Sequence, residues 1–367
     1  MVRLALVLIA AALLAAGCGS SRAAGPRPAP PRHGATYFVS PGGSDRARGT
    51  TPRTAWRTLA RVHRARLRPG DRVLFAGGAR FHGTLIPPTS GRAGAPIVFS
   101  SYGRGKAQLA DRHGAVWLPP GRSHLRFERL DLTSAGGDAA VLGSSGGGAG
   151  SRDVAVVRCR LHDAAAAGIV SPKAADAGWR IAHDEIERTG DSGVIFLGSG
   201  FAVVDTTIRA TGRDDALDYG KHGIYAKGPG ALIARNRIAG YDSAGISARF
   251  RDARILGNRI GPGPIGIAFL PDDPRAGHTT IAGNVVTGTT SAGIFVSSQN
   301  TQPERESFLI RGNRIDAASQ DGLVVERTGG DVELVGNRVQ VPRGDALALD
   351  RPGGALRERA NVWRPRA

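Results

Sequence analysis

Two pairs of polar residues stand 22 residues apart in the sequence, Tyr225 with Lys227 and Ser247 with Arg249, and His222 precedes the first pair. Residues two apart in a β-strand point to the same face. A lysine and an arginine at equivalent places would attract and neutralise an acidic group, while histidine and tyrosine can transfer protons. These residue types are suited to proton transfer beside an anionic group.

The segment 212–221, GRDDALDYGK, comes immediately before this group and is rich in acidic residues. Its aspartates are Asp214, Asp215 and Asp218. Carboxylate oxygens are ligands that Ca²⁺ prefers, so the three form a candidate calcium site, and no other cofactor is indicated. The candidate substrate-binding residues are Tyr219, Lys221 and Ser247. The simpler interpretation is a solvated turn beside a solvated strand.

The elements that would position these residues are repeats of a strand and a turn, with a Gly-Asn-Arg-Ile motif or a close variant. The repeats read IARNRI (233–238), ILGNRI (255–260), IAGNVV (281–286), IRGNRI (310–315) and LVGNRV (334–339). Upstream, the same frame holds Cys159, Asp184 and Thr206 in place of asparagine. A second strand that opens with Gly-Ile or similar follows each motif. The spacing of 22 to 30 residues is the period of solenoids.

Such a repeat predicts an all-β, single-domain solenoid in which parallel coils stack about 4.8 Å apart. The asparagines would then bond amide to amide along one corner, in a ladder. A leucine-rich repeat is the alternative, but its regularly spaced leucines are missing. Cys159 is expected to be an inert core residue. His162, His183 and His278 are expected on turns without partners.

The period of two assigns inward and outward positions in each Gly-Ile strand. Most outward positions are apolar or small, including Val141 and Gly143 in the first such strand. The coils around 222–249 break this pattern with polar residues. Insertions at 212–221, 271–278 and 297–306 flank the strands, so we expect them to wall a groove.

The chain resembles the right-handed parallel β-helix family that includes pectate lyases and chondroitinase- or alginate-lyase-like enzymes. The resemblance rests on the repeats and on the segments 37–62, 67–85 and 95–109. After Thr54, a plausible N-cap, residues 55–67 are expected to form a helix that plugs the first coil.

The resemblance implies a β-elimination lyase acting on a uronate-containing polysaccharide. Lys227 and Arg249 resemble the basic pair of such lyases, in which one cation neutralises the carboxylate and the other acts as base. His222 or Tyr225 would then be the acid. A C5-epimerase using Tyr219 or Tyr225 with His222 remains open, and so does a hydrolase, which needs two carboxylates. A non-catalytic glycan-binding or structural surface solenoid is the alternative from another class.

The N-terminus has a basic start, an apolar run over 4–16 and the end Gly17-Cys18, which is typical of a secretory signal. It resembles a bacterial lipobox, which implies lipidation of Cys18. The predicted regions are a signal at 1–18, a Pro/Ser/Arg-rich tether at 19–35, an N-terminal cap with the first coils at 36–122, repeats at 123–351 and a tail at 352–367.

The net charge of +18 favours a polyanionic partner, although most of the basic residues are arginine, as GC-rich coding also produces. Because the N-terminus indicates export, we expect an acidic polysaccharide and no nucleic acid. We expect a monomer outside the cytoplasm, secreted or held at the membrane only through the lipid.

Overall fold

The computed structural model describes residues 34–365 apart from 145, 215–219, 272–274, 298–304, 318–319 and 351–352. Its contacts divide the chain into two units, 1–33 and 34–367. The predicted signal, Cys18 and nearly all of the predicted tether therefore lie outside the described residues. Within the described ranges, no helix is both long enough and apolar enough to span a membrane.

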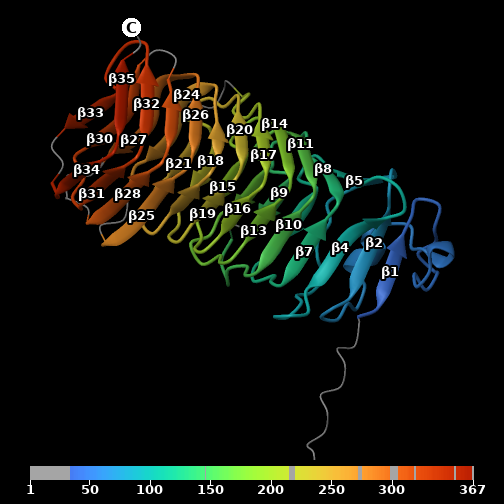
Figure 1. The fold of residues 1–367 in the computed structure, drawn as a ribbon. Helices are drawn as coiled ribbons and strands as arrows, with labels where there is room; N and C mark the ends of the chain where they lie inside the picture. The colour runs from blue at the N-terminus through green and yellow to red at the C-terminus, as the bar shows by residue number, and fades with distance from the viewer. Residues whose placement is uncertain are drawn as a thin grey trace, which may run out of the picture. The chain divides into compact units, whose positions relative to one another are not determined.

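Residues 34–367 form a solenoid of three parallel sheets, whose strands follow one another along its length from blue to red in Figure 1. The 13-stranded sheet consists of β1 (Thr36–Val39), β2 (Arg72–Ala76), β4 (Ile97–Tyr102), β7 (Leu125–Glu128), β10 (Val154–Val157), β13 (Arg180–Ala182), β16 (Ala202–Val204), β19 (Leu232–Ala234), β22 (Arg254–Leu256), β25 (Gly277–Ala282), β28 (Glu306–Arg311), β31 (Val332–Val335) and β34 (Leu356–Arg359).

The other two sheets run alongside it. The 12-stranded sheet consists of β3 (Arg80–His82), β5 (Ala107–Ala110), β8 (Leu130–Thr133), β11 (Arg160–Ala164), β14 (Glu185–Thr189), β17 (Thr207–Arg209), β20 (Arg237–Ala239), β23 (Arg259–Ile260), β26 (Val285–Thr287), β29 (Arg314–Asp316), β32 (Arg338–Val341) and β35 (Val362–Pro365). The ten-stranded sheet consists of β6 (Val116–Leu118), β9 (Val141–Gly143), β12 (Ile169–Ser171), β15 (Val194–Phe196), β18 (His222–Ala226), β21 (Ala244–Ala248), β24 (Gly263–Phe269), β27 (Thr289–Ser297), β30 (Asp321–Glu326) and β33 (Leu347–Asp350).

The predicted all-β, single-domain parallel solenoid is confirmed. Ile224 pairs in register with Ile246, which pairs with Ile267, and all three are fully buried. The two outward assignments in β9 were wrong, because Val141 pairs with the inward Ile169 and Gly143 with the inward Leu118, so that Leu142 faces outward. The strand in this coil is preceded by Ala140, where most of the equivalent strands have glycine. Without that glycine as a marker, the inward and outward positions were assigned one residue out of register.

The predicted asparagine ladder is confirmed at the corner between the 13-stranded and 12-stranded sheets. Asn258 Nδ2 donates to Asn284 Oδ1 at 3.0 Å and to the Ile233 carbonyl at 2.9 Å. The same pair of bonds is made by Asn236, Asn284, Asn313 and Asn337. The ladder runs one coil further than predicted, to Asn361. Upstream, Thr206 Oγ1 accepts from the Asp184 amide, so residues of other types continue the ladder.

The backbone conformation at the corner explains why the motif contains glycine. Gly257, Gly283, Gly312 and Gly336 each precede a ladder asparagine, with φ between 58° and 63°. This left-handed conformation favours glycine, since other residues incur a steric penalty there. Arg235 occupies the same place at φ 55°, which shows that the corner conformation is kept where glycine is absent.

The predicted capping helix was wrong in its bounds and its N-cap. The α-helix α1 covers only Leu59–His63, with Thr58 as N-cap, and Thr54 ends a separate 3₁₀ turn, η1 (Pro52–Thr54). Trp56 forms a parallel bridge with Val39 of β1, which draws 55–58 into an extended conformation. Leu59 and Val62 are still buried in the core, so the short helix does cover the first coil.

Asn258→Ala should lower the free energy of unfolding by at least about 2 kcal/mol, because the Asn236 amide and the Ile233 carbonyl would both lose a buried partner. Chemical denaturation followed by circular dichroism would measure this. Arg259→Ala changes the next, exposed residue and serves as the control. Equal stability of the two variants would contradict a structural role for the ladder.

Candidate functional site

A pocket of about 530 Å³ opens on the outer face of the ten-stranded sheet. Its floor is a row of outward residues from four successive strands, Ile195, Tyr225, Ser247 and Ala268, which pair in register. His222, at the start of β18, and Arg249, directly after β21, also line the pocket. Four of the residues singled out from the sequence therefore line one pocket.

Arg249 is the cation among the residues that line this pocket. Its amide donates to the Ala226 carbonyl at 2.8 Å, which continues the strand pairing and fixes where the side chain begins. Its guanidinium carbon lies 6.0 Å from the centre of the Tyr225 ring. A guanidinium at this range is attracted by the face of an aromatic ring. The pocket can therefore present a positioned positive charge to an anion.

His222 is held at its backbone and at its ring. The Ser192 hydroxyl accepts its amide at 2.9 Å, and the Ala244 amide donates to ring Nδ1 at 3.2 Å. Burial, followed by the positive charge of Arg249, lowers the pKa of His222 to about 4. The ring is therefore neutral at pH 7 and, with Nδ1 accepting, carries its proton on Nε2. In that state it acts as a hydrogen-bond donor.

Tyr225 and Ser247 supply the polar part of the floor. The Tyr225 ring lies 5.2 Å from the His222 ring, centre to centre, at a tilt of 36°. The Ser247 hydroxyl is buried and makes no hydrogen bond to any residue that the structure describes. A buried hydroxyl without a partner costs about 1–3 kcal/mol, so a ligand group that reached it would gain that interaction.

Asp191 and Ser192 also line the pocket and were missed from the sequence. The Asp191 carboxylate accepts from the Ser192 hydroxyl at 3.0 Å, and that hydroxyl accepts the His222 amide. The two residues thus orient His222 from the preceding coil. The sequence does contain a signal for them. Asp191 and Ser192 are polar and directly precede the glycine that opens a strand, as Lys221 and His222 do one coil later.

The two lysines singled out from the sequence, Lys221 and Lys227, are not among the residues that line the pocket. Lys227 is half-buried and follows β18 directly. Lys221 is buried, with Nζ 2.8 Å from the Asp214 carbonyl and 3.9 Å from the Asp242 carboxylate. These contacts join Lys221 to Asp214 and Asp242, and its predicted contact with a substrate stays a prediction.

The predicted calcium ligands are described only in part. Asp215 and Asp218, together with Tyr219, lie outside the described residues, and Asp214 is half-buried. In the part of the chain that the structure describes, no three His, Cys, Asp or Glu side chains come together as a metal site. A single carboxylate does not make a calcium site, so this stays a prediction that depends on Asp215 and Asp218.

His162 corrects another expectation, because it lies in β11 with two partners. Its Nε2 is 2.8 Å from the Asp131 carboxylate and its Nδ1 is 2.6 Å from that of Asp163. The hydrogen bond to Asp131 raises the pKa of His162. Arg160 and Arg188 join the same network of ion pairs on the 12-stranded sheet.

Comparisons with known proteins agree with this architecture. Residues 206–353 match the family described as the right-handed beta helix region. XylC in complex with xylose is similar at TM-score 0.65 and 10% identity, over 85% of this chain and 76% of that one. Pectate lyase Pel9A is similar at TM-score 0.53 and 13% identity, over 89% and 79%.

The A-module of the Azotobacter vinelandii mannuronan C-5 epimerase AlgE4 is similar at TM-score 0.53 and 15% identity, over 78% of this chain and 90% of that one. No curated protein matches the chain. At these identities the solved structures establish the fold and not the activity. The fold is a right-handed parallel β-helix, as the family resemblance implied and as the repeats predicted for a parallel solenoid.

The protonation of His222 can be tested by NMR of its ring nitrogens. Above pH about 6.5 the ring should be neutral with its proton on Nε2, and it should charge only near pH 4. Because the folded pKa lies below the ordinary value, the stability that this ring contributes is present above pH about 6.5 and is lost towards pH 4. His162 is the internal control and should titrate at higher pH. An imidazolium at position 222 at pH 6 would contradict this account.

Proposed function

We propose that the protein acts on an acidic, uronate-containing polysaccharide and cleaves it by β-elimination. The observation that carries this proposal is the pocket in which Arg249, Tyr225 and a neutral His222 meet over a floor made by adjacent coils. Elimination begins with removal of the proton next to the uronate carboxylate. A cation that neutralises the carboxylate makes that proton more acidic, and the pocket holds one.

The roles follow from the chemistry of each side chain. Arg249 pairs with the uronate carboxylate through its guanidinium fork. His222 donates a hydrogen bond from Nε2 to the same group as negative charge develops on it. The Tyr225 oxygen takes the proton next to the uronate carboxylate as the C4–C5 double bond forms, and it then returns that proton to the glycosidic oxygen that leaves as the C4–O bond breaks. Lys227, one coil from Arg249 at the equivalent position, attracts a neighbouring uronate.

A hydrolase is less well supported by the pocket. Glycoside hydrolysis uses a pair of carboxylates, either about 5 Å or about 6.5–9.5 Å apart. Among the described residues that line this pocket, Asp191 is the one carboxylate, and it accepts a hydrogen bond from the Ser192 hydroxyl. The described lining residues therefore do not supply the pair that a hydrolase needs.

A C5-epimerase is the second candidate, and the proximity of Tyr225 and His222 favours it. Epimerisation begins with the same proton removal but returns a proton to the opposite face of the sugar. The two reactions differ in outcome, because elimination yields an unsaturated, cleaved product. Epimerisation in D₂O would place deuterium at C5 without cleaving the chain.

Export belongs to this proposal as well. We infer from the N-terminal sequence that the solenoid acts outside the cytoplasm, where polysaccharides are found, either secreted or anchored through a lipid on Cys18. The proposed form is a monomer.

The activity can be tested by incubating the protein with polygalacturonate, alginate and glycosaminoglycans and following the absorbance of the unsaturated product. Arg249→Ala should lower kcat/KM about 10²–10³-fold, since the transition-state charge loses its partner. Arg254→Ala, an exposed arginine of β22, is the matched control. Full activity of Arg249→Ala would refute the site, and binding without any product would favour the non-catalytic alternative.

The roles of Tyr225 and Lys227 can be separated by single substitutions. Tyr225→Phe should lower kcat at least about 100-fold with little change in KM, because it removes only the proton-transfer group. Lys227→Ala should chiefly raise KM. The reverse result, with kcat lost in Lys227→Ala and retained in Tyr225→Phe, would make Lys227 the base.

A further inference from the structure

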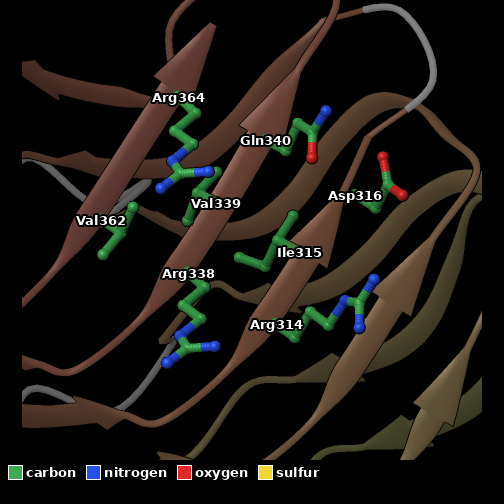
Figure 2. Close-up of a pocket in the computed structure, with 8 residues that line it drawn as sticks. All are labelled: Arg314, Ile315, Asp316, Arg338, Val339, Gln340, Val362 and Arg364. Atoms are coloured by element: carbon green, nitrogen blue, oxygen red, sulfur yellow. The ribbon is translucent and has the colours of Figure 1, made fainter. Parts of the chain in front are cut away.

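The outer face of the 12-stranded sheet carries exposed arginines in successive strands near the C-terminal end. They are Arg237 in β20, Arg259 in β23, Arg314 in β29, Arg338 in β32 and Arg364 in β35, here called the arginine row. The row is interrupted at β26, where Val285 lies between Arg259 and Arg314, and Arg364 lies opposite Gln340. Arg237 pairs in register with Arg259, and Arg314 with Arg338. Figure 2 shows the last three rising from neighbouring strands around a second pocket of about 440 Å³.

The arginine row differs from the earlier coils of the same sheet. There, Arg160 lies 2.6 Å from the Glu187 carboxylate, and Arg209 lies 2.7 Å from it, so carboxylates neutralise the arginines. Within the described ranges, no carboxylate forms an ion pair with any member of the arginine row. Of the described residues that line the second pocket, Asp316 is the one that is acidic.

Two pairs within the row, Arg237 with Arg259 and Arg314 with Arg338, are unfavourable in the protein alone. Like charges directly opposite each other on neighbouring strands repel, and the strands of this sheet are about 4.8 Å apart. A bound anion would relieve this repulsion. The guanidinium fork matches a carboxylate with two parallel hydrogen bonds. A linear polymer with regularly repeated carboxylates, lying along the solenoid, fits this surface.

A nucleic acid fits less well. Proteins that hold single strands combine a basic groove with aromatic side chains on which bases stack. The described outward residues of this sheet between and beside these arginines are small, aliphatic or polar, such as Ala239, Thr287 and Gln340. The aromatic residue of β35, Trp363, pairs with the inward Val339 and so does not lie on this face. The surface provides charge without a stacking platform.

We propose that the arginine row is a second binding surface, for a polyuronate chain, on a different sheet from the proposed active site. The choice of polymer rests on the proposed function, whereas the surface itself rests on the arginines. It would keep the enzyme on a long polymer while another segment or chain occupies the pocket of the ten-stranded sheet. Short oligomers, which cannot occupy both, would not depend on it.

The test uses the full chain and a triple variant, Arg314→Gln, Arg338→Gln and Arg364→Gln. The matched control changes three exposed arginines of the 13-stranded sheet, Arg72→Gln, Arg180→Gln and Arg254→Gln, with the same loss of charge. The row variant should bind long polygalacturonate about tenfold more weakly than the wild type at low salt, with a shallower salt dependence. The control should bind as the wild type does.

Two further measurements keep the outcomes distinct. The denaturation midpoint of the row variant should equal or exceed that of the wild type, because repulsion is removed, so weak binding cannot be attributed to unfolding. Turnover of short oligouronates should be unchanged. If the wild type turns over no uronate but the row variant still loses polymer binding, the surface holds and the proposed function fails.

Equal binding losses in the row variant and the control would overturn the proposal, because net charge alone would then explain them. Unchanged binding by the row variant would overturn it while leaving the lyase activity untouched. Binding of single-stranded DNA of matched length is measured as well, to test nucleic acid as the alternative ligand. If DNA bound more tightly than polygalacturonate through the same arginines, the polyuronate assignment would be wrong.

Discussion

The constant register of the stacked coils is the constraint on which the rest of the structure depends. The asparagine side chains hold this register at one corner, where each amide satisfies both a backbone carbonyl and the next asparagine. With the corner fixed, the strands that follow cannot slip by one residue without turning every inward side chain outward. The pairing of Tyr225 with Ser247 in the ten-stranded sheet follows from this corner, although the asparagines lie between the other two sheets.

The proposed site uses that regularity to bring residues from separate coils together. Asp191 and Ser192 belong to one coil, His222 to the next and Ala244 to the one after, and hydrogen bonds join all three coils. Burial and the positive charge of Arg249 keep His222 neutral in this position. A fixed cation next to a neutral donor and a tyrosine suits an anionic ligand better than a neutral one.

Much of the fold could be predicted because each coil repeats the same local rule. Because side chains alternate between the two faces of a strand, the sequence predicted that Tyr225 and Ser247 lie on one outer face, and the repeated asparagines predicted the ladder. Features that depend on neighbours in space were not accessible. The burial of Lys221 depends on Asp214 and Asp242, and the short helix depends on the bridge that Trp56 makes with β1. The Val141 assignment failed because its coil lacks the glycine that marks the frame.

The central claim is that the pocket over β18 and β21 receives a uronate. A crystal structure of the full chain with a bound oligouronate tests it most directly. The account predicts a uronate carboxylate paired with the Arg249 guanidinium, with the sugar beside Tyr225 and within hydrogen-bonding reach of His222 Nε2. An oligouronate bound only on another face, with the pocket left to solvent, would contradict it.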